Sequence, residues 1–285
     1  MSLDPRLNAF RPDLADARLA GQAGSARLVE GRPARIAAPV ADLRNDPTLS
    51  AGLGSQLLRG DEVLVFEEHG GWGWVQSERD SYVGYLQADA LARRGAPATH
   101  IVAAPRTFIY TADDMKSPRA DALSIGTLLT IAGTSERRGT AYAELAEGGF
   151  VIAAHLRPVS DEAADFVAVA ETLEFTPYLW GGASAFGLDC SGLVQLSMRM
   201  AGRPVLRDTD MQARSVGTEI DPGRDCRDLR RGDLVFWNGH VAIMTDAENL
   251  IHANGHTMTV SRERLDDAVR RISYLYGAPT GFRRS

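Results

Sequence analysis

The sequence contains little cysteine and no long apolar run. Its 285 residues include two cysteines, Cys190 and Cys226. Two cysteines cannot build a disulfide framework, and this pair lacks the Cys-x-x-Cys spacing of a typical metal site. No stretch approaches the roughly 20 apolar residues that a membrane-spanning helix needs. We therefore expect neither a disulfide-stapled domain nor a membrane protein, and we expect no bound metal.

Positive charge is also sparse. The chain has 31 Lys and Arg residues against 37 Asp and Glu residues, which gives a net charge of -6. A face that binds nucleic acid requires clustered positive charge, so no nucleic-acid partner is expected. With 44% hydrophobic and 24% charged residues, the composition is that of an ordinary globular protein.

The first residues, MSLDPRLNAFRPDLADARLAG, carry charge throughout and lack the continuous apolar core of a secretory signal. We therefore expect a cytoplasmic protein, because a reducing compartment keeps a free thiol available. We expect a monomer, although nothing in the sequence fixes the oligomeric state.

The N-terminal segment, residues 1–33, is predicted to be a helical arm. Apolar Leu14, Ala17, Leu19 and Ala20 lie among charged residues, a pattern typical of an amphipathic helix that packs on a larger body.

Two series of short β-rich runs follow the arm. The runs IAAPVADLR, DEVLVFEEH, GWGWVQS and YVGYLQ lie within residues 34–96, and glycine, aspartate and asparagine separate them. A similar series, from HIVAAPRTFIYT to GGFVIAAHL, occupies residues 97–159. Short strands of even spacing are typical of small antiparallel barrels. The sequence thus predicts two SH3-like barrels related by an approximate internal repeat.

Helical periodicity appears after the second β series. Ser160 is the expected N-cap of a first helix, and further helices are expected over Cys190–Ala201 and near Met211–Val216. Strands then take over, and the Asn-Gly pair between DLVFW and HVAIMT is a strong hairpin signal. Helices followed by strands predict an α+β domain over residues 160–285.

The stretch YLWGGASAFGLDCSGLVQ places a cysteine at the start of a helix. Asp189 is a good N-cap, which puts Cys190 in the first turn. Free amide groups and the positive end of the helix dipole there favour a thiolate. The backbone N–H of Cys190 can also face an oxyanion that forms on an attacked carbonyl.

A thiolate nucleophile needs an imidazole within reach. His240 directly follows the Asn238-Gly239 turn, and His252 lies in the next strand, where alternation can bring it to the same edge. One ring can serve as base and the other can orient it. Taken singly, a cysteine at a helix start is commonly a small buried residue, and a histidine in an apolar strand is commonly structural. The ordered combination of the three residues carries the hypothesis.

Three blocks carry a family resemblance: YLWGGASAFGLDCSGLVQ, LRRGDLVFWNGHVAIM and LIHANG. Over about residues 160–280 they resemble the NlpC-type cell-wall cysteine peptidases, a papain-like family. The resemblance implies that Cys190 is the nucleophile, His240 the base and His252 the third polar group. It also implies that Tyr178 and the Cys190 amide form the oxyanion hole, and that no cofactor is needed.

With two SH3-like modules ahead of it, the chain resembles the subgroup that cleaves γ-D-glutamyl–diamino acid bonds in murein peptides. The resemblance implies that the first barrel forms a wall of the active site. It implies that Asp189 and Tyr82 hold the free amine of an N-terminal L-alanine, and that Ser191 and Asp208 occupy substrate-holding positions. The expected function is a cysteine peptidase of murein peptide recycling, with lysine and diaminopimelate both open as the third residue.

Simpler interpretations of the four substrate-binding candidates remain open. Asp189 and Asp208 can each be helix caps and nothing more. Tyr82 can be ordinary barrel packing. Two other functions also remain open: an amidase or acyltransferase of the same fold, and a murein-peptide binding protein without catalytic activity.

Overall fold

The computed structural model describes residues 3–24 and 27–285. The chain divides into two compact units, residues 1–161 and 162–285, which are described separately. Among the described residues, no helix has the length and apolar character needed to cross a membrane.

The predicted helical arm is wrong for the residues that the structure describes. The segment forms short strands and one 3-10 turn, Ala17–Leu19, instead of an α-helix. The strands are β1 (Phe10–Arg11), β2 (Leu14–Asp16) and β3 (Leu28–Val29). Leu14 and Ala15 are consecutive residues of β2 whose side chains point to opposite faces, and both are fully buried, so the short strand is covered on both sides. Leu14 packs with Phe66 and Trp74 of the following β module, so tertiary packing overrides the local pattern.

The first β module follows the predicted runs closely. Its sheet has the strand order β10-β4-β7-β8-β9-β5-β6. The strands are β4 (Arg32–Ile36), β5 (Val40–Arg44), β6 (Leu53–Leu58), β7 (Glu62–His69), β8 (Trp72–Ser77), β9 (Val83–Gln87) and β10 (Leu91–Arg93). Val63 and Val65 alternate with more exposed neighbours along β7, as expected for a strand with one face in a core. Trp74 is buried against Phe66, with ring centroids 5.5 Å apart, so this tryptophan of GWGW is a core residue.

The second β module repeats the pairing pattern of the first. Its strands are β11 (His100–Val102), β12 (Arg106–Tyr110), β13 (Arg119–Ser124), β14 (Leu128–Leu129), β15 (Ile131–Arg137), β16 (Thr140–Leu145), β17 (Phe150–Ile152) and β18 (Leu156–Pro158). The pairs β12–β13, β12–β17, β16–β17 and β11–β18 correspond to β5–β6, β5–β9, β8–β9 and β4–β10. The two predicted SH3-like barrels are not confirmed, because no closed barrel is found among the described residues. In the described chain the sheets remain open, and the second module is split between sheets where β14 ends and β15 begins.

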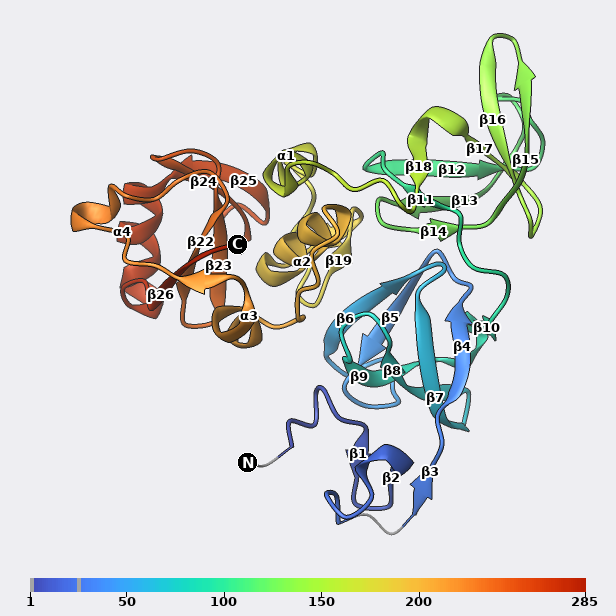
Figure 1. Ribbon diagram of the computed structural model, residues 1–285, viewed down its shortest axis with the longest axis horizontal. Coiled ribbons are helices and arrows are strands. Elements are labelled where there is room, and N and C mark those ends of the chain that lie inside the picture. Colours follow the sequence, from blue (N-terminus) through green and yellow to red (C-terminus); the bar gives the residue numbers. More distant parts are fainter. Residues whose placement is uncertain (1–2, 25–26) are drawn as a thin grey trace. The chain divides into compact units, whose positions relative to one another are not determined.

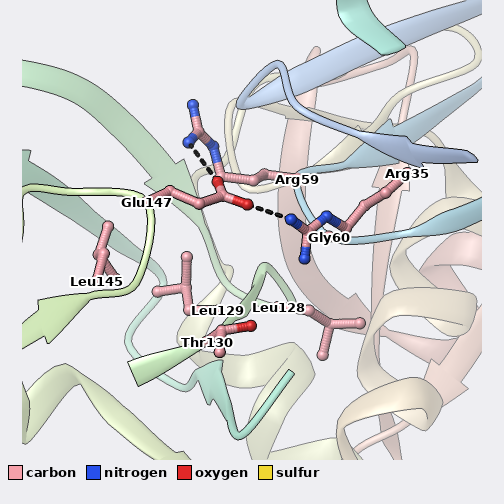
Figure 2. Close-up of a pocket in the computed structure, with 8 residues that line it drawn as sticks. All are labelled: Arg35, Arg59, Gly60, Leu128, Leu129, Thr130, Leu145 and Glu147. Carbon is pink, nitrogen blue, oxygen red and sulfur yellow. Dashed lines mark hydrogen bonds and ion pairs between the residues drawn. The ribbon is translucent and has the colours of Figure 1, made fainter. Parts of the chain in front are cut away.

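Polar contacts join the two β modules inside the first unit. Glu147 lies between Arg35 and Arg59 and pairs with both guanidinium groups (Figure 2). Arg59 also pairs with Asp121 at 2.8 Å. Because these contacts are partly exposed, each is worth at most about 1 kcal/mol, so they orient the modules more than they stabilise them.

The second unit is built on a sheet with the strand order β21-β26-β22-β23-β24-β25. The strands are β21 (Thr218–Glu219), β22 (Asp233–Trp237), β23 (His240–Met244), β24 (Asn249–Asn254), β25 (Thr259–Arg264) and β26 (Gly281–Arg284). The helices are α1 (Phe166–Thr172), α2 (Cys190–Met200), α3 (Thr209–Ser215) and α4 (Leu265–Tyr276). A small hairpin of β19 (Ala183–Ser184) and β20 (Gly187–Leu188) precedes α2. This mixture agrees with the predicted α+β class.

Helices α2 and α4 lie on opposite sides of this sheet (Figure 1). Nearly every residue of α2 is buried, which is the expected state of a helix covered on all sides. Helix α4 packs Leu265, Ala268 and Ile272 against side chains of one sheet face, including Trp237 and Leu250. The two helices thereby hold in place the end of the sheet at which β23 begins with His240.

The helix boundaries confirm one predicted cap and correct another. Helix α2 begins at Cys190 with Asp189 as N-cap, as the sequence predicts. The first helix begins at Phe166, later than Ser160 predicts, because Asp165 caps it by accepting a hydrogen bond from the Val167 amide at 2.8 Å. Both residues suit the cap position, and burial of the apolar face selects the later one.

Candidate active site

The N-terminus of α2 holds the Cys190 thiol at the tip of the β22–β23 hairpin. The sulfur lies 3.7 Å from Thr209 Oγ1 and 4.0 Å from the carbonyl oxygen of Gly239. Gly239 has φ +76°, a conformation that the hairpin turn requires and that glycine adopts without strain. The turn therefore places the residue after it, His240, in the lining of the same cavity as Cys190.

His240 and His252 form a bonded pair across neighbouring strands. His240 Nε2 lies 2.8 Å from His252 Nδ1, and the rings are edge to face. His252 is fully buried, whereas His240 is partly exposed. The remaining ring nitrogen of His240, Nδ1, is left for a substrate or for the thiol. The sequence expectation that both rings meet at one edge is thus observed.

Two charged side chains extend the pair on its buried side. His252 Nε2 lies 2.8 Å from Glu263 Oε1, and Glu263 pairs with Arg271 of α4. Glu263 lies on the next strand, β25, in which Ser261 is the register partner of His252. Neither residue was predicted from the sequence, because nothing local sets Glu263 or Arg271 apart from the other charged side chains of residues 261–271.

A cavity of about 530 Å³ opens at these groups. Its lining includes Tyr178, Cys190 and His240. Trp180, Leu275 and Tyr276, all well exposed, form part of its apolar rim. A pocket with an apolar wall and a few convergent polar groups is typical of a small-ligand or peptide site. Within the described part of the chain, no cluster of three or more His, Cys, Asp or Glu side chains could hold a metal ion.

The protonation states differ from the sequence expectation of a resting thiolate. Burial, reinforced by the Asp189 carboxylate, raises the pKa of Cys190 to about 11. Burial and the neighbouring His252 lower the pKa of His240 to about 3. The resting pair at neutral pH is therefore a neutral thiol and a neutral imidazole. Desolvation of the charged form outweighs the helix dipole here, because the sulfur is enclosed.

This neutral histidine pair makes folding sensitive to acid. An unfolded histidine with a pKa near 6.5 takes up a proton that folded His240 refuses, so the free energy of unfolding falls as the pH drops from about 6.5 towards 3. We expect chemical denaturation to show lower stability at pH 5 than at pH 7, with a smaller difference in His240→Gln. The exposed His69→Gln variant is the control and should match wild type. Equal slopes in wild type and His240→Gln would contradict this prediction.

Tyr178 is held beside the thiol as a neutral hydroxyl donor. Its backbone N–H donates to the Met258 carbonyl at 2.8 Å, which ties the segment before α2 to the loop after β24. Burial, with smaller electrostatic contributions from Cys190 and Asp189, raises the pKa of the Tyr178 phenol above its usual value. A phenol that stays protonated can donate to a developing oxyanion.

Asp189 is saturated with protein donors. Its carboxylate accepts from the backbone amides of Gly192 at 2.7 Å and Gly181 at 2.9 Å, and from Ser191 Oγ at 3.2 Å. Arg207, which is 1% exposed, donates to both carboxylate oxygens, at 3.0 and 2.7 Å. A carboxylate has about four acceptor positions, so an incoming amine would have to displace one of these partners. The structure therefore gives Asp189 the capping role that the sequence left open, and its amine-binding role stays a prediction.

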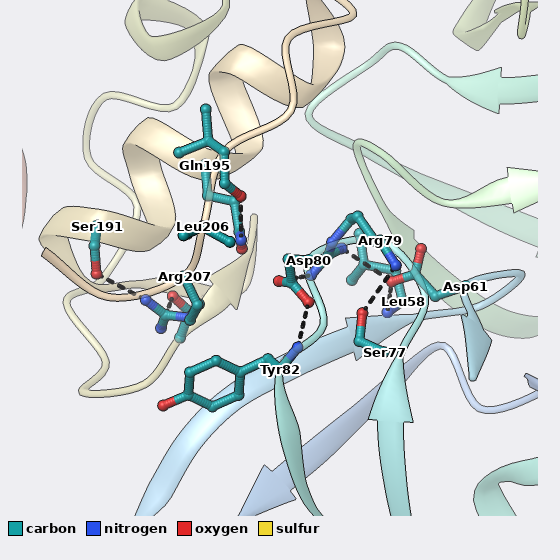
Figure 3. Close-up of polar contacts among 12 residues, drawn as sticks. Leu58, Asp61, Ser77, Arg79, Asp80, Tyr82, Ser191, Gln195, Leu206 and Arg207 are labelled. Carbon is teal, nitrogen blue, oxygen red and sulfur yellow. Dashed lines mark hydrogen bonds and ion pairs between the residues drawn. The ribbon is translucent and has the colours of Figure 1, made fainter. Parts of the chain in front are cut away.

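The other expected substrate residues lie in different surroundings. Ser191 is buried and accepts a hydrogen bond from Arg207 at 2.8 Å (Figure 3). Asp208 occupies the N-cap position of α3, but its side chain makes no capping hydrogen bond. Tyr82 belongs to the first unit, where it is buried and its amide donates to Asp80 (Figure 3). Substrate binding by the three residues stays a prediction.

Family models match both units. Residues 175–275 match the NlpC/P60 family, and residues 43–91 match the bacterial dipeptidyl-peptidase SH3 domain. The chain carries an NlpC/P60 domain. The family resemblance inferred from the three sequence blocks is thereby confirmed.

Relatives and a solved structure agree with this assignment. Dipeptidyl-peptidase 6 of Lysinibacillus sphaericus is 27% identical over 81% of this chain and 91% of its own. The gamma-D-glutamyl-L-lysine dipeptidyl-peptidase of Bacillus subtilis is 28% identical over 64% of this chain and 63% of its own. The crystal structure of an NlpC/P60 family protein from Bacillus cereus covers 89% of this chain and 99% of its own, with a TM-score of 0.73 and 21% identity. The last likeness concerns the fold alone.

Two further residues of the NlpC/P60 domain belong to the site and escaped the sequence analysis. Thr209 contacts the sulfur, and Arg207 joins the loop before α3 to the N-terminus of α2. Both stand in LRDTDMQ, the stretch in which Asp208 was the predicted substrate residue. Arg207 is buried and Asp208 is partly exposed, so the neighbour of the predicted residue makes the buried contact.

Proposed function

We propose that the protein is a cysteine peptidase that hydrolyses the γ-D-glutamyl–diamino acid bond of murein peptides with a free N-terminal L-alanine. The NlpC/P60 match and the named activities of the two dipeptidyl-peptidase relatives support the substrate class. The observation that carries the proposal is the placement of Cys190, His240 and Tyr178 around one cavity, with His252 bonded behind His240.

The geometry supports a general-base mechanism. As the Cys190 sulfur forms a bond to the γ-carbonyl carbon of D-glutamate, its proton passes to Nδ1 of neutral His240. The Cys190 amide and the Tyr178 hydroxyl donate to the oxyanion. His240 then gives the proton to the departing amine as the C–N bond breaks. Water, deprotonated by His240, releases the peptide from the thioester and restores the thiol.

The buried thiol and base explain how a neutral pair can work. A Cys190 thiolate and a His240 imidazolium are costly to form in this enclosed cavity before a substrate is bound. The proton transfer therefore coincides with attack on the carbonyl carbon instead of preceding it. His252 and Glu263 lie on the far side of His240 and stabilise the imidazolium when it forms. The substrate thus meets a site that becomes charged only in the course of the reaction.

The substrate proposal is tested with defined tripeptides, L-Ala-γ-D-Glu followed by lysine or by meso-diaminopimelate, each with a free or an acetylated N-terminus. Mass spectrometry should show cleavage after D-glutamate and faster cleavage of the free peptides. Equal rates for acetylated and free peptides would contradict the amine requirement. Transfer of the acyl group to an added amine in preference to water would instead indicate an acyltransferase.

We also propose that the enzyme acts in the cytoplasm on peptides released from the wall, as part of recycling. The support is chemical: the nucleophile is a free thiol, which a reducing compartment preserves. Fractionation of the producing cells with a tagged chain tests this, and recovery outside the cytoplasm would contradict it.

A further inference from the structure

We propose that Glu263 is the positioning residue that sets the tautomer of both active-site histidines and so leaves His240 Nδ1 free to accept the thiol proton. The proposal rests on the assignment of Cys190 and His240 as the reacting pair. It adds a fourth member, on strand β25, to the Cys-His-His arrangement.

The contacts between Glu263, His252 and His240 determine where the hydrogens lie. An ionised carboxylate only accepts hydrogen bonds, so it favours a hydrogen on the nitrogen of His252 that lies 2.8 Å from Glu263 Oε1, although the two groups are not aligned as a regular hydrogen bond. That nitrogen is Nε2. In a neutral imidazole the other nitrogen, Nδ1, is then an acceptor. His240 Nε2, 2.8 Å from His252 Nδ1, must therefore be the donor. This leaves Nδ1 of His240 without a hydrogen, as a general base requires.

Three features favour an ionised Glu263 and a neutral His252. Arg271 pairs with the same carboxylate oxygen that faces His252. Burial raises the pKa of Glu263, but the contacts with His252 and Arg271 outweigh it, and the pKa lies below its usual value. Burial lowers the pKa of His252. These features favour one arrangement of hydrogens along Glu263, His252 and His240, with a hydrogen on Nε2 of each histidine.

Position in the sheet makes this assignment rigid. His252 and Glu263 lie on adjacent antiparallel strands, β24 and β25, whose register pairs His252 with Ser261 and Leu250 with Glu263. Residues at even spacing on paired strands share a face, so both side chains point to the side covered by α4. Arg271 reaches the carboxylate from that helix. Backbone pairing and helix packing hold the group in place without help from a substrate.

The test compares two substitutions of the same residue in the full chain. Glu263→Gln keeps the shape but offers an amide N–H to His252, which permits the opposite tautomer. Glu263→Asp keeps the carboxylate. We expect Glu263→Gln to lower kcat about 10- to 100-fold with little change in KM, the usual size of an effect on a group that orients a ligand or base. Glu263→Asp should recover most of the loss.

The matched control is Glu248→Gln, which removes an exposed carboxylate paired with Arg264, the residue next to Glu263. It should behave as wild type in every assay. Circular dichroism and thermal unfolding of all the variants separate a positioning role from a general loss of folding.

Two measurements need no peptide substrate, so the inference can fail separately from the proposed function. Long-range ¹H–¹⁵N spectra of histidine-labelled protein should show the Nε2–H tautomer for His252 and His240, and a changed tautomer for Glu263→Gln. Iodoacetamide alkylation of Cys190 at neutral pH should slow in Glu263→Gln and not in Glu248→Gln. An Nδ1–H tautomer of His252 in wild type, or unchanged spectra and alkylation in Glu263→Gln, would overturn the inference.

Discussion

Replacement of Cys190 by alanine is expected to lower kcat/KM for murein tripeptides by at least about 10⁴-fold, to the background rate. No other side chain that lines the cavity carries a thiol, so among the described residues none there can replace Cys190 in forming the thioester. The loss should lie in kcat, since the cavity wall that binds the peptide is unchanged. Mass spectrometry of digests at long incubation times gives the residual rate.

Cys226→Ala is the matched control for this experiment. Cys226 is also a free thiol, half-buried beside the core under α4 and away from the cavity lining. Its substitution should leave activity within about twofold of wild type, in line with an ordinary change outside the site. Hydrolysis that persists in Cys190→Ala would remove the cysteine mechanism, and thermal unfolding would show whether each variant is folded.

Disruption of the Asp189–Arg207 pair is expected to lower the free energy of unfolding by about 3–5 kcal/mol, the usual cost of breaking a buried ion pair by removing one charge. Asp189→Asn keeps the size of the side chain but removes the carboxylate charge that faces the Arg207 guanidinium, which is 1% exposed. The same change weakens the cap of α2, the helix that begins with the nucleophile. Urea denaturation measures the loss.

A double substitution separates the pair from its surroundings. Arg207→Met alone should also be strongly destabilising, because it leaves the carboxylate buried. The combined Asp189→Asn and Arg207→Met variant should be more stable than the sum of the two losses predicts, since neither charge remains. Glu248→Gln, which breaks an exposed pair, should cost less than about 1 kcal/mol. Additive losses in the double variant would contradict a direct interaction between Asp189 and Arg207.

For Asp189 the sequence predicts the structural role correctly but leaves open whether the residue also binds the substrate amine. The sequence identifies Asp189 as a helix cap, because a cap is decided by the residue and by the two or three amides that follow it. Whether the same carboxylate is free to hold an amine depends on Arg207, which is 18 residues away in sequence. Only the folded chain shows that the acceptor positions are already occupied.

The helical arm illustrates the opposite outcome. Leu14 and its apolar neighbours fit a helix if the segment is considered alone. Phe66 and Trp74 offer it an apolar face, against which Leu14 packs fully buried from a short extended strand. Local propensity is worth fractions of a kcal/mol per residue, whereas burial of a leucine is worth about 2 kcal/mol, so packing decides.

For this protein the sequence alone determined the features that neighbouring residues control. These are the start of α2 at Cys190, the Asn238-Gly239 hairpin that presents His240, and the alternation that turns His252 to the same edge. Tertiary structure alone decided the partners that stand behind them: Glu263 against His252, Arg271 against Glu263, and Arg207 against Asp189. The reason is physical: caps and turns depend on hydrogen bonds within a few residues, whereas burial and charge pairing depend on groups that meet only after the chain has folded.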